Sequence, residues 1–161
     1  MKLFLSSALL LLSAGLFAQT NFSGTWALNE SKSNFGDSQF RMASTTLVAT
    51  QDAKVLTVET TRPGRDGQET KSTAKYNLDG TPSENPGFGN SVRKSTVTWS
   101  ADKASITIAS TMTFDMNGET RTMNSSETWK LTEGGKVLLL NNVMPGFEGG
   151  EMKTTAAYDK K

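Results

Sequence analysis

The chain has 161 residues, with 17 Lys and Arg, 16 Asp and Glu, and no cysteine or histidine. Loss of a signal peptide containing Lys2 would leave 16 basic and 16 acidic residues, and this balance argues against a nucleic-acid partner, because phosphate binding needs a basic surface. Without cysteine or histidine, most metal sites and activated nucleophiles are excluded, so we expect no metal, no cofactor and no enzymatic activity.

Residues 1–18 have the pattern of a secretory signal peptide. Lys2 precedes the apolar run Leu3–Leu12, and the segment ends on the small residue Ala18, a plausible cleavage site. The apolar run is shorter than the ~20 residues that a membrane-spanning helix needs. We therefore expect no membrane span, a secreted or periplasmic location, and one domain over residues 19–161.

The first stretch of the expected mature chain is a short strand over residues 22–28. Its alternation places Gly24 and Trp26 on the same face, so the indole is predicted to point inward beside a residue that has no side chain. The segment 29–36 follows, with polar capping residues at its start and a glycine at its end, and is predicted to be an irregular or 3₁₀ turn.

The rest of the chain alternates apolar residues with Thr, Ser and charged residues, which has the period of two expected of half-buried strands. The other expected strands are 45–50, 55–61, 70–78, 92–99, 104–114, 119–131, 136–143 and 150–158. Asp66-Gly67 and Asn117-Gly118 are typical hairpin turns, whereas 79–90 is predicted to be one long loop. Sequential hairpins predict an all-β, antiparallel up-and-down β-barrel of about eight strands. Its outer face is polar, unlike that of an outer-membrane barrel.

A motif in the first strand resembles a known family. The Phe22-x-Gly24-x-Trp26 spacing resembles the opening motif of the lipocalins and the wider calycin group. The chain is most similar to small secreted bacterial lipocalin-like proteins, in which a Gly-Thr-Trp-x-Leu-Asn stretch is followed by Lys-Ser and Phe-Gly. In this chain those residues are Lys32, Ser33, Phe35 and Gly36.

This resemblance implies an eight-stranded barrel with one end closed by Trp26. It also implies a basic residue from the last strands above the indole ring, in a cation–π arrangement. Lys153, Lys160 and Lys161 are the candidates.

A barrel of this size is either filled by side chains or holds one small ligand. The inward-facing positions combine aromatic, aliphatic and methionine side chains with several hydroxyls, which need partners if they are buried. A cavity with water or ligand would satisfy these hydroxyls, and so would backbone groups in a filled core. The predicted ligand-binding residues are Tyr76, Arg93, Trp99, Ile108, Met112, Met123, Glu127 and Trp129.

Arg93 and Glu127 are charged residues at inward-facing positions, where a charge is tolerated only when paired or bound. Three arrangements are open. The two side chains approach each other across the lumen, Arg93 holds the acidic head of an amphipathic ligand such as a fatty acid, or both lie at the rim in solvent.

The loops 86–89 and 145–149 both contain a Pro-Gly-Phe step before a strand, and the strand count places them at the same end of the barrel. Their phenylalanines would form an aromatic lid over a mouth or fill gaps at the barrel end. The lipocalin strand order would put this end at the closed base, which conflicts with a lid.

The sequence favours a secreted lipocalin-like protein that holds a small hydrophobic or amphipathic ligand in its cavity. The alternative is a filled barrel that acts as a structural or interaction module of the cell envelope, with no small-molecule ligand.

Overall fold

The structure is a computed structural model that describes residues 18–36, 43–64, 68–116, 118–146 and 149–161. Residues 1–17 of the predicted signal peptide, and residues 65–67 and 117 of the two predicted hairpin turns, lie outside this part of the chain. No helix within the described ranges is long and apolar enough to cross a membrane.

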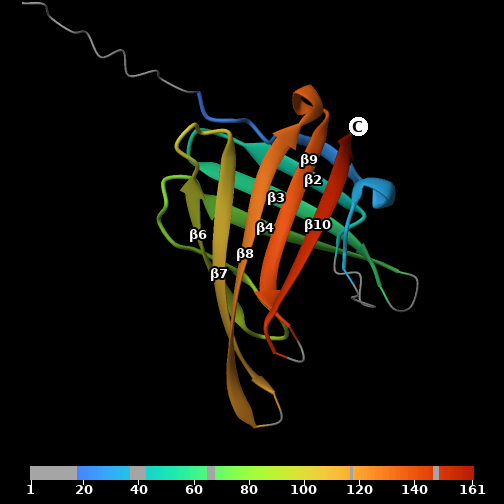
Figure 1. The fold of residues 1–161 in the computed structure, drawn as a ribbon. Helices are drawn as coiled ribbons and strands as arrows, with labels where there is room; N and C mark the ends of the chain where they lie inside the picture. Colours follow the sequence, from blue (N-terminus) through green and yellow to red (C-terminus); the bar gives the residue numbers. More distant parts are fainter. Residues whose placement is uncertain (1–17, 37–42, 65–67, 117, 147–148) are drawn as a thin grey trace, which may run out of the picture.

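Within the described residues, ten antiparallel strands form one sheet in the order β4-β3-β2-β1-β10-β9-β8-β7-β6-β5. Their bounds are β1 Gly24–Leu28, β2 Thr46–Gln51, β3 Val55–Pro63, β4 Glu69–Asn77, β5 Ser83–Pro86, β6 Val92–Trp99, β7 Ser105–Met116, β8 Glu119–Thr132, β9 Val137–Pro145 and β10 Glu151–Lys160. Two 3₁₀ turns, η1 (Glu30–Lys32) and η2 (Glu133–Gly135), complete the elements. In Figure 1 the sheet curls into a near-closed barrel, with β6 to β10 in front of β2 to β4.

The predicted all-β up-and-down fold is confirmed, but the prediction of about eight strands was wrong. The strand that sequence reasoning missed is β5, inside the predicted loop 79–90. Its residues do alternate, since Ser83 and Asn85 are buried while Glu84 and Pro86 are exposed. The buried members are polar, so a search for apolar alternation does not detect this strand.

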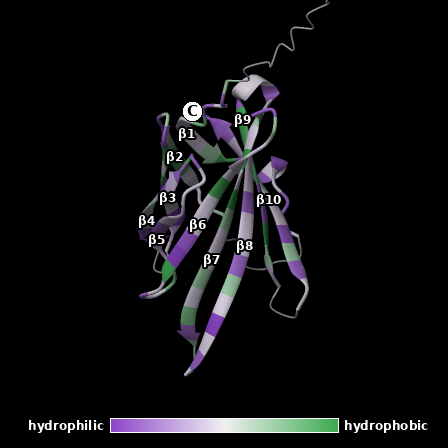
Figure 2. Ribbon diagram, turned by 90° about the vertical axis from the view of Figure 1, so that its left-hand side faces the viewer, coloured by the Kyte–Doolittle hydropathy of each residue, from purple (hydrophilic) through white to green (hydrophobic). Residues whose placement is uncertain are grey.

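The residues of β7 and β8 show why the other strands were predictable. Hydrophobic residues recur at alternate positions along β7, between more hydrophilic ones (Figure 2). On the outer face, Thr107 and Thr128 share a hydrogen bond of 3.0 Å, and Thr111 donates to Asn124. Threonine suits such positions because its branched side chain packs well on a pleated surface.

One side chain closes the gap between β4 and β5, which share no backbone ladder. The amide N–H of Lys75 donates to Oδ1 of Asn85 at 2.7 Å, and Nδ2 of Asn85 donates to the carbonyl of Lys75 at 2.9 Å. The buried Asn85 amide therefore takes the place of one residue of a paired strand.

We expect Asn85→Leu to lower the free energy of unfolding by about 1–3 kcal/mol, because both backbone groups of Lys75 lose their partner. Urea unfolding measures the loss, and hydrogen exchange at the Lys75 amide should accelerate. The control is Asn124→Leu on the exposed outer face, which should change stability by less than about 0.5 kcal/mol. Unchanged exchange at Lys75 would contradict this role.

Trp26 closes one end of the barrel, as predicted. It is fully buried, and its Nε1 donates to the carbonyl of Phe22 at 3.1 Å. Phe22 stacks on Trp99 with a centroid distance of 6.1 Å and meets Trp129 edge-on at 5.9 Å. Nζ of Lys160 lies 5.3 Å from the centroid of the Trp26 ring, so Lys160 is the cation among the three candidates.

The geometry also explains the glycine of the first-strand motif. A Cβ at Gly24 would lie 3.1 Å from Cε of Lys160 and 3.4 Å from the Trp26 ring. A larger residue would therefore push the lysine away from the indole that it covers.

The segment after β1 extends the seam between β1 and β10. Asn29 caps η1 by accepting from the Lys32 amide, which identifies the predicted cap. Ser33 Oγ accepts from the Ala157 amide at 2.9 Å, and Asn34 forms a two-way backbone bridge with Thr155. The predicted turn is therefore confirmed, and it adds hydrogen bonds where β1 itself pairs with only the end of β10.

Candidate ligand-binding cavity

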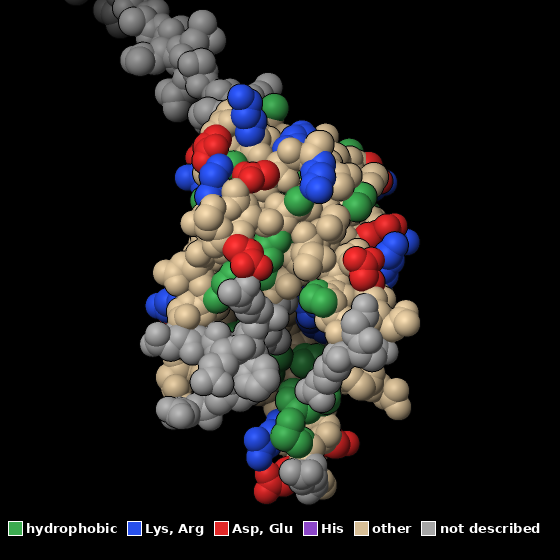
Figure 3. Space-filling model, turned by 90° about the vertical axis from the view of Figure 1, so that its right-hand side faces the viewer, with side chains coloured by type: hydrophobic (Ala, Val, Ile, Leu, Met, Phe, Trp, Pro, Cys, Tyr) green, Lys and Arg blue, Asp and Glu red, His purple; other side chains and the backbone are tan. Residues whose placement is uncertain are grey.

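A cavity with a volume of about 500 Å³ lies between the closed end and the opposite end of the barrel. It is lined by residues of every long strand and by residues of the linkers at its open end, including Phe35 and Ser44. Figure 3 shows hydrophobic side chains gathered at the end where the β7–β8 hairpin projects. The side chains of the described residues therefore do not fill the barrel.

The strand register arranges the cavity wall in cross-strand rows. Nearest the closed end is an apolar row of Trp129, Leu140 and Ala156. The next row is Ile108, Glu127, Asn142 and Thr154. Toward the mouth follow a serine row, Ser95, Ser110 and Ser125, and then a row of Arg93, Met112 and Met123. The cavity thus has an apolar floor and a polar middle.

Part of the serine row is satisfied within the protein. Ser95 Oγ and Ser110 Oγ share a hydrogen bond of 2.8 Å, and Ser83 Oγ donates to the carbonyl of Ser95. For Ser95 and Ser110, the open question of hydroxyl partners is therefore answered by nearby protein groups.

Glu127 is half-buried, lines the cavity and places a carboxylate inside the barrel. Nε1 of Trp129 donates to its Oε1 at 2.6 Å. Loss of hydration raises the pKa of Glu127 above its ordinary value, while the Trp129 hydrogen bond and the charges of Arg93 and Arg62 oppose the rise. The raised pKa means that Glu127 stays protonated to a higher pH than an exposed glutamate.

Two guanidinium groups also line the cavity. Arg93 comes from β6, and its Nε is buried without a hydrogen-bond partner. Arg62 comes from β3 at the mouth, where its Nε donates to Ser44 Oγ at 3.1 Å. Two cations and one carboxylate line the cavity among the described residues, so this part of the lining has a net positive charge whether Glu127 is ionised or neutral.

The structure decides part of the question left open for Arg93 and Glu127. Among the described residues no ion pair joins them, although the charge of Arg93 acts on the pKa of Glu127. Glu127 lies in the interior row rather than at the rim. Arg93 is therefore a buried donor that the protein leaves partly unpaired.

Two tyrosines face the same lumen, Tyr76 from β4 and Tyr158 from β10. Burial raises the pKa of both phenols above the ordinary value, with the charge of Glu127 adding to the rise. Both hydroxyls therefore stay protonated at neutral pH and remain neutral donors.

Seven of the eight predicted site residues line this cavity: Tyr76, Arg93, Ile108, Met112, Met123, Glu127 and Trp129. Trp99 does not. It belongs to the closed end, where it stacks on Phe22 and its Nε1 donates to the carbonyl of Leu78 at 3.2 Å.

Sequence reasoning missed Arg62, Asn142 and Tyr158 as cavity residues. Arg62 lies just beyond the predicted end of its strand. Asn142 shares a face with Leu138 and Leu140 in β9, so the alternation of that strand was a usable signal.

The mouth carries an exposed aromatic side chain. Phe88, in the linker between β5 and β6, is 72 % exposed, packs edge-on against Phe114 at 6.3 Å and also lines the cavity. Residues 86–89 and the described residues 145, 146 and 149 do lie at one end, and it is the open end. The additional strand β5 reverses the direction of every later strand, so the expected conflict between an aromatic lid and a closed base does not arise. Phe147 and Glu148 lie outside the described residues.

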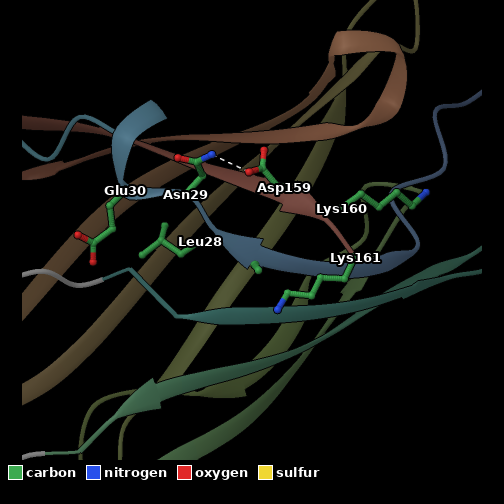
Figure 4. Close-up of a pocket in the computed structure, with 7 residues that line it drawn as sticks. Leu28, Asn29, Glu30, Asp159, Lys160 and Lys161 are labelled. Carbon is green, nitrogen blue, oxygen red and sulfur yellow. Dashed lines mark hydrogen bonds between the residues drawn. The ribbon is translucent and has the colours of Figure 1, made fainter.

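A second depression of about 530 Å³ lies on the outer surface beside β1 and β10, and its lining includes Leu28, Glu30 and Lys161. Figure 4 shows the hydrogen bond of 2.6 Å from Nδ2 of Asn29 to Asp159, while the charged ends of Glu30 and Lys160 point in opposite directions. Its polar groups do not converge on one point, so the interior cavity is the candidate site.

No family model matches the chain, and no curated protein matches its sequence. A match among solved structures is the zebrafish ileal bile acid-binding protein in complex with cholic acid. The two chains are 15 % identical, with a TM-score of 0.53 over 87 % of this chain and 98 % of that one. At this identity the likeness shows the fold alone, and it supports the predicted calycin-type barrel.

Proposed function

We propose that this chain is a binding protein that holds a small hydrophobic or amphipathic ligand in its barrel cavity. The observation that carries the proposal is the cavity of about 500 Å³, which combines an apolar floor with the unpaired Nε of Arg93. Ligand sites are typically ~300–1,000 Å³, mostly apolar, with a few polar groups that orient the ligand.

The alternative of a filled structural or interaction barrel is less well supported. A filled barrel would not retain a cavity of this size or leave a buried guanidinium N–H without a partner. The structural neighbour was also solved in complex with a small amphipathic ligand, cholic acid.

The proposal includes export. Residues 1–18 combine a basic start, an apolar run and a small residue at the end, and these features support cleavage after Ala18 and a periplasmic or extracellular site of action.

Native mass spectrometry of the protein, purified without detergent from the exported fraction, tests both parts of the proposal. We expect the mass of residues 19–161 plus a small molecule that is released on denaturation. Ala156→Phe, which fills the floor of the cavity, should lose the adduct, whereas Ala53→Phe on an exposed turn should keep it.

Two outcomes would contradict the proposal. An adduct-free protein that also takes up no fluorescent fatty acid would remove the binding function. A chain that retains residues 1–18 in the exported fraction would remove the cleavage.

A further inference from the structure

The wall of the cavity contains an acceptor that the protein does not satisfy. Oδ1 of Asn142 is buried and has no hydrogen-bond partner, and the Asn142 side chain lines the cavity. A buried acceptor without a partner is unfavourable, so most buried acceptors in native structures are satisfied by a protein group, a water or another bound molecule. Asn142 therefore needs a donor, which a bound ligand can supply.

Glu127 lies directly beside this acceptor. It is the cross-strand partner of Asn142, so the two side chains stand next to each other on the inner face of β8 and β9. Its carboxylate accepts a hydrogen bond only from Trp129, through Oε1, among the described residues. In its ionised form Glu127 accepts hydrogen bonds only, and it then forms with Asn142 a wall of hydrogen-bond acceptors, which we call the acceptor wall.

The charge of the lumen decides which kind of donor fits the acceptor wall. Arg62 and Arg93 give the described part of the cavity lining a net positive charge, so an ammonium group would be repelled. A hydroxyl is a neutral donor, so the two arginines do not repel it. An anionic group elsewhere on the same ligand would be attracted by the same two arginines.

We propose that the acceptor wall of Glu127 and Asn142 selects ligands that carry a hydroxyl group in addition to their acidic group. The inference rests on the proposed function and names the ligand class: hydroxylated amphipathic acids rather than simple fatty acids. The apolar row beneath the wall, with Trp129 and Leu140, would hold the ring or chain that carries the hydroxyl.

Two matched pairs of acids test the proposal on the mature protein by calorimetry. Cholate is compared with cholanate, which has the same ring skeleton and carboxylate but no hydroxyl, and 12-hydroxyoctadecanoate is compared with octadecanoate. We expect at least one hydroxylated acid to bind about tenfold tighter than its partner, because the partner leaves buried acceptors unpaired.

Asn142→Leu should reduce this preference to within about twofold by weakening the hydroxylated acid. Asn142→Met is the second variant, since methionines already line the mouth, if circular dichroism shows that Asn142→Leu is not native. Asn141→Leu is the control. Its amide lies on the outer face, where it accepts from Thr155 Oγ1, and it should keep the preference.

The outcomes separate the inference from the proposed function. If wild type binds both members of each pair equally, or if the Asn142 variants keep the preference, the acceptor wall is not a hydroxyl site, while the binding function stands. If none of the four acids binds, the inference falls, and the proposed function falls with it when the purified protein also carries no adduct.

Discussion

Trp26→Ala should lower the free energy of unfolding by about 3–5 kcal/mol, the range measured for removal of a large buried aromatic side chain. The indole is fully buried at the closed end, so its loss leaves a void that the surrounding strands cannot easily fill. The substitution also removes the Nε1 hydrogen bond to Phe22 and the ring beneath Lys160. Urea unfolding followed by circular dichroism measures the loss.

Lys160→Met isolates the contribution of the cation above the ring. It keeps most of the aliphatic stem over the indole and should lower stability by only about 0.5–1 kcal/mol. A loss below about 1 kcal/mol for Trp26→Ala would contradict the role of the indole as the closure of the barrel.

The barrel was predictable because the alternation that marks a strand in the sequence also buries one face of that strand in the fold. Buried and more exposed residues alternate along β2, β6 and β7, and burial of one face fixes the register of each strand. The motif around Trp26 was equally predictable. A glycine at position 24 leaves room beside the indole for the Lys160 side chain that covers it.

The missed strand shows the limit of this reasoning. β5 buries Ser83 and Asn85, whose polar side chains are satisfied by Ser95 and Lys75 on the neighbouring strands. Those partners are distant in sequence, so no local pattern reveals the strand. Because each strand of a meander reverses direction, the omission also produced the expected conflict between an aromatic lid and a closed base.

Strand alternation predicted many of the residues that line the cavity, but it did not predict how far along each strand the cavity extends. Trp99 has the same alternation as Arg93, yet it lies in the closed end because Phe22 stacks on it there. Which inward positions are filled and which remain open depends on the packing of side chains from opposite walls, and a single strand does not encode that packing.

Arg93→Met should weaken the binding of a fluorescent fatty acid by about 10- to 100-fold, the effect of losing a hydrogen bond to a charged group. The Nε of Arg93 is buried without a partner, and no carboxylate of the described residues pairs with its guanidinium. A ligand carboxylate would satisfy both its charge and its free donors. Methionine keeps the aliphatic bulk beside Met112, the cross-strand neighbour of Arg93, so the cavity should keep its shape.

A fatty alcohol of the same chain length separates the effect of charge from that of shape. Its affinities for Arg93→Met and for wild type should agree within about twofold. Lys94→Met is the matched control. Lys94 is the next residue along β6, is exposed, and pairs with Glu84 at 3.3 Å on the outer face, so the acid should keep its affinity. Equal affinity of wild type and Arg93→Met for the acid would mean that the guanidinium does not hold the head group. The positive charge of Arg62 at the mouth would then be the remaining anchor within the described part of the cavity.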